Sequence, residues 1–306
     1  MNATTVRGVV PIIPVPFRPD ESVDQEGLAA CCTFAAERGA AAMCLPAFAS
    51  EFYKLSTEER GAVVRVAVRT VGGRVPVIAQ SNHGSARLAA ELARANEKAG
   101  ADAVSVALPR NFGYTEADLL DFARTVGQAV GVPLLIQDWN PTGPTVGGEF
   151  CARLREACPN FRYIKLEEPG MGPKVRQILA TCGEAVGVLE GWGGAFMLEL
   201  IPAGIAGIMP GLALVDVLDR VWRLARGGDR TGAFALFARI HPWLAFTLLS
   251  VESLNYLEKT LLVQRGVLRA SHVRRPTITL DTDSQAYGDF LMEQALQTIA
   301  ETERAR

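Results

Sequence analysis

The sequence predicts an α/β protein: a (β/α)8 TIM barrel followed by a C-terminal helical appendage. Short apolar or β-branched runs alternate with longer segments of helical spacing, and this alternation is typical of parallel βα units. It occurs eight times by about residue 225, as a closed barrel requires. After residue 226 helices follow one another without intervening strands. We therefore predict a barrel domain over residues 1–226 and a C-terminal helical domain over residues 227–306.

Each predicted strand is a short apolar run. The eight strands are expected over residues 9–15, 42–45, 75–79, 103–107, 134–137, 163–167, 185–189 and 205–209.

The helices between the strands carry their own boundary signals. The first helix is expected from near Asp24 to Gly39, and a serine or threonine followed by acids predicts further helix starts at residues 56–59 and 115–118. In the C-terminal domain, helices are expected over roughly residues 230–249, 251–265 and 283–304.

Composition excludes several classes of function. The 306 residues include 31 basic and 33 acidic side chains, so the net charge is −2 and no basic face favours nucleic acid. No run approaches the roughly 20 apolar residues of a membrane span. The six cysteines form no CxxC pair, so we expect them to be reduced and the protein to be cytoplasmic. We expect a small-molecule partner.

The most informative segment runs from Tyr163 to Glu167 and places Lys165 inside an apolar strand. A cation is costly to bury there, and residues two apart on a strand share a face, so Lys165 and Glu167 should point the same way. An amine in an apolar wall loses its proton more readily and can then attack a ketone. From this segment alone, covalent catalysis and a buried Lys–Glu ion pair are equally plausible.

Polar residues follow several predicted strands, at the end of a barrel where active sites lie. Ser50 lies in the turn after the second strand, His83 follows the third, Gln137 ends the fifth, and Gly191 follows the seventh. His83 either contacts a substrate hydroxyl or caps its own turn. Gln137 either donates to substrate or packs at the mouth of the barrel. For Glu51 we favour a cap of its own loop.

These segments resemble the dihydrodipicolinate synthase/N-acetylneuraminate lyase family of Schiff-base-forming barrels. The resemblance runs from about Gly8 to the C-terminal helices, and its motifs are specific only in combination. They lie at residues 8–17, 47–51, 55–60, 73–78, 100–103, 163–165 and 204–208.

The resemblance implies roles for particular residues. Lys165 is then the Schiff-base lysine, and no cofactor is required. The turn at residues 47–51, with Phe48, Ala49 and Ser50, holds the carboxylate of a 2-oxo acid. Gly191 and Ile208 line the pocket through backbone groups. The family further implies a homotetramer.

Three departures from the family pattern narrow the function. The turn lacks the family's paired hydroxyls, which leaves Ser50 alone. The strand-five tyrosine is replaced by Gln137, and Thr142-Gly143 stands where the synthases place an arginine. Glutamine cannot relay a proton as a phenol does, so dihydrodipicolinate synthase activity is disfavoured.

The pattern is most similar to the L-2-keto-3-deoxyarabonate dehydratase branch. We therefore expect dehydration of a 2-keto-3-deoxy sugar acid through a Lys165 imine, with Glu167 moving protons or serving as a plain counter-ion. The alternatives are a pyruvate-releasing aldolase of the same family and a catalytically silent protein that binds a 2-oxo acid. No motif in the sequence predicts a metal site.

Overall fold

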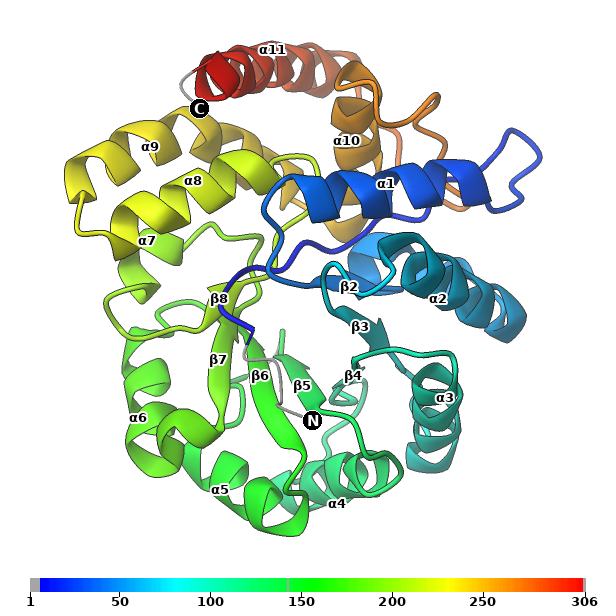
Figure 1. The fold of residues 1–306 in the computed structure, drawn as a ribbon, viewed down its shortest axis with the longest axis vertical. Helices are drawn as coiled ribbons and strands as arrows, with labels where there is room; N and C mark the ends of the chain where they lie inside the picture. The colour runs from blue at the N-terminus through cyan, green and yellow to red at the C-terminus, as the bar shows by residue number, and fades with distance from the viewer. Residues whose placement is uncertain (1–5, 142, 305–306) are drawn as a thin grey trace.

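A single parallel sheet of eight strands organises the part of the chain that the computed structural model describes, residues 6–141 and 143–304. The sheet is curled, with helices outside it, as a (β/α)8 barrel requires (Figure 1). The strands are β1 (Gly8–Val9), β2 (Met43–Leu45), β3 (Val77–Gln80), β4 (Ala103–Ala107), β5 (Leu134–Trp139), β6 (Phe161–Glu167), β7 (Gly187–Glu190) and β8 (Gly207–Ile208).

The order of the strands is β1-β8-β7-β6-β5-β4-β3-β2, and every ladder is parallel. At the two ends of this order, β1 and β2 are linked through the segment after β1. The Ile13 N–H donates to the Cys44 carbonyl at 3.0 Å, and the Cys44 N–H donates to the Pro11 carbonyl at 3.0 Å. These bonds bring the turn after β2 next to the segment that follows β1.

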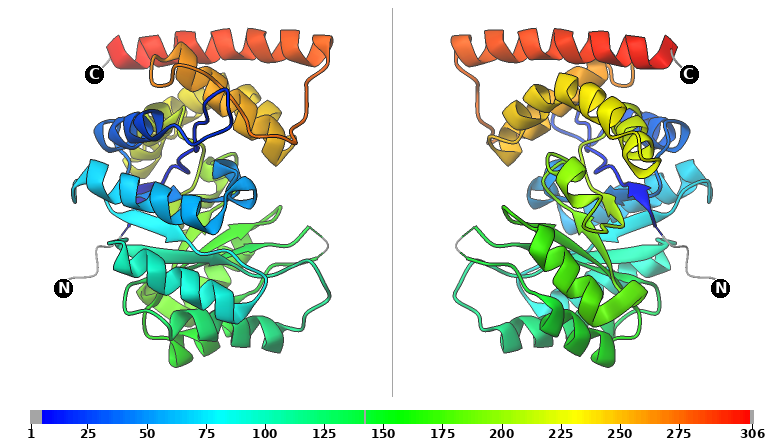
Figure 2. Two further views of the ribbon diagram at one scale, coloured as in Figure 1. Left: turned by 90° about the vertical axis from the view of Figure 1, so that its right-hand side faces the viewer. Right: turned by 90° about the vertical axis from the view of Figure 1, so that its left-hand side faces the viewer.

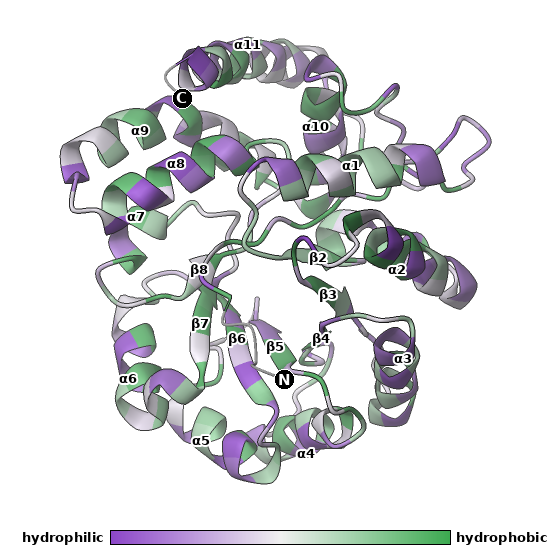
Figure 3. Ribbon diagram, in the orientation of Figure 1, coloured by the Kyte–Doolittle hydropathy of each residue, from purple (hydrophilic) through white to green (hydrophobic). Residues whose placement is uncertain are grey.

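Eight helices connect or follow the strands in the described part of the barrel region. They are α1 (Gln25–Glu37), α2 (Thr57–Val71), α3 (Ala86–Lys98), α4 (Glu116–Gly127), α5 (Gly148–Ala157), α6 (Gly172–Cys182), α7 (Met197–Leu200) and α8 (Val215–Arg226). The expected starts of α2 and α4 are confirmed by two capping boxes, Ser56 with Glu59 and Thr115 with Asp118. Figure 3 shows hydrophobic β3 and β7 surrounded by helices of mixed hydropathy.

Within residues 227–304, three helices follow the barrel region: α9 (Arg230–Thr247), α10 (Val251–Gln264) and α11 (Thr282–Arg304). Helix α11 lies across one end of the molecule (Figure 2). Helix α9 packs against both α8 and α11, so the C-terminal helices are continuous with the outer helical layer. The division into domains at residues 226/227 stays a prediction.

The first strand is shorter than the sequence analysis expects. The run over residues 9–15 contains Pro11 and Pro14, which have no N–H to donate to a ladder, so only Gly8–Val9 forms a strand and Ile12 makes isolated bridges. The seventh strand begins two residues late, because η3 (Gly183–Ala185), a 3₁₀ turn, occupies the expected start. The eighth is limited to Gly207–Ile208.

None of the helices in the described residues combines the length and the hydropathy needed to cross a membrane.

Helix α10 carries a buried acid that contacts the loop after β8. Glu258 is 5% exposed, and its Oε2 accepts a hydrogen bond from the Ala213 N–H at 2.8 Å. Burial raises the pKa of the Glu258 carboxyl to about 7. The folded protein therefore holds a proton that the unfolded chain releases near the ordinary value of 4.5.

We expect Glu258→Gln to gain stability over the wild type as the pH rises. Between the two pKa values the folded state binds more protons, so the contribution of Glu258 to the free energy of unfolding falls with rising pH. Glutamine does not titrate, so this pH-dependent contribution is lost. The free energy of unfolding of the variant, relative to that of the wild type, should increase by roughly 2 kcal/mol from about pH 5 to about pH 7. Urea unfolding across this range measures it, with exposed Glu156→Gln on α5 as the matched control. A constant difference would contradict the expectation.

Candidate active site

A cavity of about 260 Å³ lies at the carboxyl ends of the strands. Its charged and amide side chains are Lys165 and Glu167 of β6 and Gln137 of β5, and Ser250 also lines it, whereas Ser50 does not. The rest of the wall is largely apolar. It comes from Ile12, from Trp139 of β5 and from four further segments: residues 47–49, 191–193, 209–211 and 248–254.

Lys165 lies in the middle of the sheet. It is 7% exposed, and its neighbours in register are Gln137 on β5 and Leu189 on β7. The amine Nζ lies 2.9 Å from Oε1 of Glu167, two residues further along the same face of β6. The amine and its carboxylate therefore both point into the cavity, as strand geometry predicts.

A chain of hydrogen bonds crosses three strands to reach Glu167. Gln80 of β3 donates through Nε2 to Oε1 of Gln137 at 2.5 Å, and Gln137 donates through Nε2 to Oε1 of Glu167 at 2.6 Å. The Gln137 amide thus fixes the carboxylate that contacts Lys165. The sequence analysis does not single out Gln80. Its contact with Gln137 joins β3 to β5, which are separated in the sheet by β4, and strand ends read one at a time do not predict such a contact.

The turn after β2 presents Phe48 and Ala49 to the cavity, but Ser50 points away. Ser50 is fully buried, and its hydroxyl donates to the Ile13 carbonyl at 2.6 Å. In this geometry Ser50 ties the turn, the 3₁₀ segment η1 (Phe48–Ser50), to the chain after β1. Glu51 also faces away from the cavity and forms ion pairs with Lys54 and Lys259.

The loop after β7 forms the opposite wall. Glu190 is 1% exposed, and its carboxylate accepts the Gly194 N–H at 2.7 Å, which fixes the turn that carries Gly191 and Trp192. Burial raises the pKa of Glu190 to about 7. Gly191 packs so closely on β6 that a Cβ atom there would lie 2.3 Å from Glu167 Cγ and 2.8 Å from Lys165 Cε.

His83 and Ile208 are not in the wall of this cavity. His83 borders a separate hollow of about 420 Å³ beside Arg60 and Asn82, and its Nδ1 accepts the Ser85 N–H at 2.9 Å, as a cap of its own turn would. Ile208 is fully buried in β8, and the residues after it, 209–211, reach the cavity instead. The segment Thr142-Gly143, where the sequence analysis finds no arginine, cannot be compared in full, because Thr142 lies outside the described residues.

The sequence analysis missed the part of the wall that comes from the C-terminal region. Leu248, Leu249 and Ser250 link α9 to α10, and Val251 and Leu254 belong to α10 itself. Reading the strand ends could not find them, because they are brought to the cavity only by tertiary packing. Within the described residues, no three His, Cys, Asp or Glu side chains gather as a possible metal site.

The fold and the site define a class of parallel α/β proteins that hold a buried lysine in a pocket at the carboxyl ends of their strands. Residues 5–295 match the model of the dihydrodipicolinate synthetase family, and the chain belongs to this family of lyases. The resemblance inferred from the sequence is thereby confirmed. Lyases of this family use a lysine Schiff base and require no cofactor.

Individual relatives share a quarter to a third of the sequence. The chain is 28% identical to an L-2-keto-3-deoxyarabonate dehydratase of Azospirillum brasilense over 286 residues, 92% of this chain and 91% of the relative. It is 30% identical to a 4-hydroxy-tetrahydrodipicolinate synthase of Nitrosococcus oceani over 287 residues, 92% and 94% of the two chains.

Solved structures show the same fold. A prophage protein of the dihydrodipicolinic acid synthase family from E. coli K12, in complex with pyruvate, is 25% identical, with a TM-score of 0.84 over 94% of this chain and 98% of its own. The 4-hydroxy-tetrahydrodipicolinate synthase of Methylacidiphilum fumariolicum SolV superimposes with a TM-score of 0.89 over 98% and 99% of the two chains, at 20% identity.

We expect Gly191→Ala to separate Lys165 from Glu167, because the added methyl group would overlap both side chains. Any pyruvate adduct on Lys165 that borohydride traps should form about a hundredfold more slowly than in the wild type. Gly113→Ala is the control, since a Cβ atom at Gly113 meets open space. A Gly191→Ala rate within a few-fold of the wild type would show that the close packing at Gly191 does not set the geometry of the pair.

Proposed function

We propose that the protein is a Schiff-base-forming lyase of a 2-oxo acid that dehydrates a 2-keto-3-deoxy sugar acid resembling L-2-keto-3-deoxyarabonate. The observation that carries this proposal is the pair of Lys165 Nζ and Glu167 Oε1, which lie 2.9 Å apart in the cavity, with Glu167 held by Gln137. A nucleophile beside a positioned acid-base group is the arrangement that such a reaction needs.

In the proposed reaction the Lys165 amine attacks the C2 ketone, and loss of water gives a protonated imine. This imine withdraws electrons from C3, so a base can remove a C3 proton to form an enamine. The enamine expels the C4 hydroxyl as water when an acid protonates it. Loss of a C5 proton, tautomerisation and hydrolysis of the imine then release a semialdehyde and free Lys165.

Glu167 is the proposed acid-base group, because it is the carboxylate in contact with the amine. It takes the C3 proton as a carboxylate, and as the acid that results it protonates the departing C4 hydroxyl. Gln137 donates to Glu167 and so orients it, in the position where family members carry a tyrosine. The backbone of the turn at Phe48 and Ala49 is the proposed binding site for the substrate carboxylate, and Gly191 borders the same space.

Trapping with borohydride tests the covalent step. After incubation with pyruvate and borohydride, we expect mass spectrometry to find a pyruvate-sized adduct on Lys165, and none on Lys165→Ala. A lysine so close to a carboxylate could also be a plain ion pair, and absence of any adduct from a panel of 2-oxo acids would establish that alternative. The protein would then be a silent binder, whose affinity for the acid survives Lys165→Ala.

The products distinguish the dehydratase from an aldolase of the same family, since both begin with a Lys165 imine. Dehydration gives a semialdehyde without pyruvate, whereas cleavage of the C–C bond releases pyruvate. The relative from Azospirillum brasilense, a dehydratase by name, supports the first outcome. Release of pyruvate would overturn it.

We expect Glu167→Gln to lower kcat by about 10²- to 10⁴-fold while the pyruvate adduct still forms, because proton transfer is lost and the amine remains. Turnover of the sugar acid and the extent of trapping are measured on the same preparation. Glu168→Gln serves as the control, since Glu168 pairs with Lys174 rather than Lys165. If Glu167→Gln kept full turnover, Glu167 would be only a counter-ion.

Two further features belong to the proposal. All six cysteines are free thiols, which supports the cytoplasm as the compartment. Membership of the family supports a homotetramer, which sedimentation analysis would test.

A further inference from the structure

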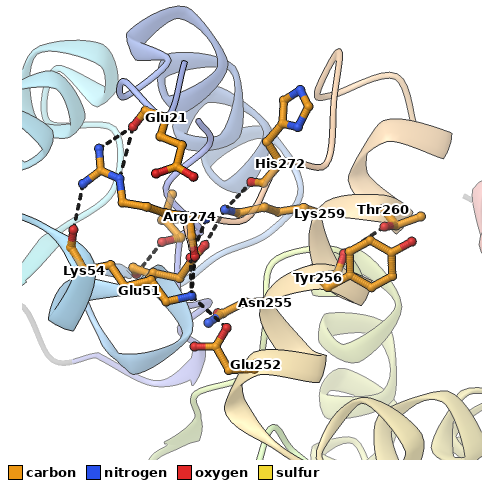
Figure 4. A network of polar contacts seen from close by, with 12 residues as sticks. Glu21, Glu51, Lys54, Glu252, Asn255, Tyr256, Lys259, Thr260, His272 and Arg274 are labelled. Atoms are coloured by element: carbon orange, nitrogen blue, oxygen red, sulfur yellow. Dashed lines mark hydrogen bonds and ion pairs between the residues drawn. The ribbon is translucent and has the colours of Figure 1, made fainter. Parts of the chain in front are cut away.

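A fully buried ion pair lies behind the turn that carries Phe48 and Ala49 (Figure 4). Glu51 is 0% exposed and Lys259 of α10 is 1% exposed, and their Oε1 and Nζ atoms are 2.5 Å apart. The Lys259 amine also donates to the His272 carbonyl at 2.9 Å and lies 4.5 Å from the centre of the Phe17 ring. A charge buried so deeply needs a partner, so Lys259 and Glu51 fix each other's position.

The second carboxylate oxygen of Glu51 is also engaged. Oε2 lies 3.1 Å from Nζ of Lys54, and it accepts the backbone N–H of Arg274 at 3.1 Å. Lys54 belongs to η2 (Phe52–Lys54), the 3₁₀ segment that follows the turn, whereas Lys259 and Arg274 come from the C-terminal region. One carboxylate therefore joins the turn to two segments more than 200 residues away in sequence.

The backbone at Glu51 explains why its side chain points away from the cavity. Glu51 has φ 57°, in the left-handed region that non-glycine residues rarely adopt. This conformation reverses the chain between η1 and η2, so that Phe48 and Ala49 face the cavity while the Glu51 carboxylate faces α10. A strained conformation persists where the surroundings hold it, and here the buried cations do so.

Helix α10 contacts the same region at a second point. Glu252, in its first turn, accepts hydrogen bonds from Lys54 Nζ at 2.7 Å and from the Tyr53 hydroxyl. Val251 and Leu254 of this helix line the cavity directly. The helix that anchors the turn is thus also part of the pocket wall.

We propose that Lys259 is a positioning residue, which acts through Glu51 to hold the Phe48–Ala49 turn where it receives the carboxylate of the 2-oxo acid. This inference rests on the proposed function. Lys259 does not border the cavity, so it can act on a ligand only through the turn. We therefore expect it to affect capture of the carboxylate and to leave the reacting atoms at Lys165 unchanged. Burial lowers the pKa of Lys259, and the adjoining Glu51 carboxylate opposes that effect.

The test measures the initial rate of borohydride-trapped adduct on Lys165 over a range of pyruvate concentrations. Lys259→Met keeps a long, unbranched side chain and removes the charge. For this variant we expect the half-saturating pyruvate concentration to rise by at least about tenfold, with a maximal rate within about twofold of the wild type. Lys259→Arg, which keeps the charge, should restore much of the affinity. Arg239→Met is the control, since it breaks the partly exposed Arg239–Glu301 pair between α9 and α11.

Each other outcome overturns the proposal. An unchanged half-saturating concentration in Lys259→Met shows that the turn does not need the ion pair. A fall in maximal rate alone would place the effect at Lys165 rather than at carboxylate capture. If Lys259→Met does not fold, the Glu51→Gln/Lys259→Met variant, which leaves no unpaired charge, is measured with the same expectation. A wild type that forms no adduct removes the proposed function itself, and this inference with it.

Discussion

The parallel alignment of the eight strands is the constraint on which the site depends. Because every strand runs the same way, their carboxyl ends meet on one side of the sheet, and the register between neighbours decides which side chains come together there. Lys165 lies in register with Gln137, so the amide that orients Glu167 is already beside the lysine strand. A slip of one residue in β5 would turn Gln137 away from the cavity.

Charges are buried at two levels around the pocket. Lys165 and Glu167 face the cavity, whereas Lys259 and Glu51 lie behind its wall, inside the protein. The first pair borders open space and is available to a ligand. The second has its oxygens and amine fully engaged by protein groups, so it acts as structure. Similar side chains thus differ in role through what surrounds them.

Much of the fold and the centre of the site could be predicted from the sequence. The apolar runs predicted β4 and β5 to within two residues of their observed ends, and Lys165 was recognisable as a cation in an apolar strand. The directions of side chains in the turns could not be predicted. Ser50 faces away from the cavity because its hydroxyl donates to the Ile13 carbonyl, a contact between distant segments that no local pattern indicates. The sequence likewise left two roles for His83 undecided, and the structure favours a cap of its own turn over a place in the cavity.

The wall formed by residues 248–254 has a consequence for how the protein is made. A ribosome synthesises the barrel strands first, so β6 and its lysine can be in place while the chain that closes the pocket is still missing. The pocket is therefore completed only after α9 and α10 have packed. A newly made chain therefore carries Lys165 beside an incomplete pocket wall until α9 and α10 have been synthesised, so the strands can form before the pocket is complete.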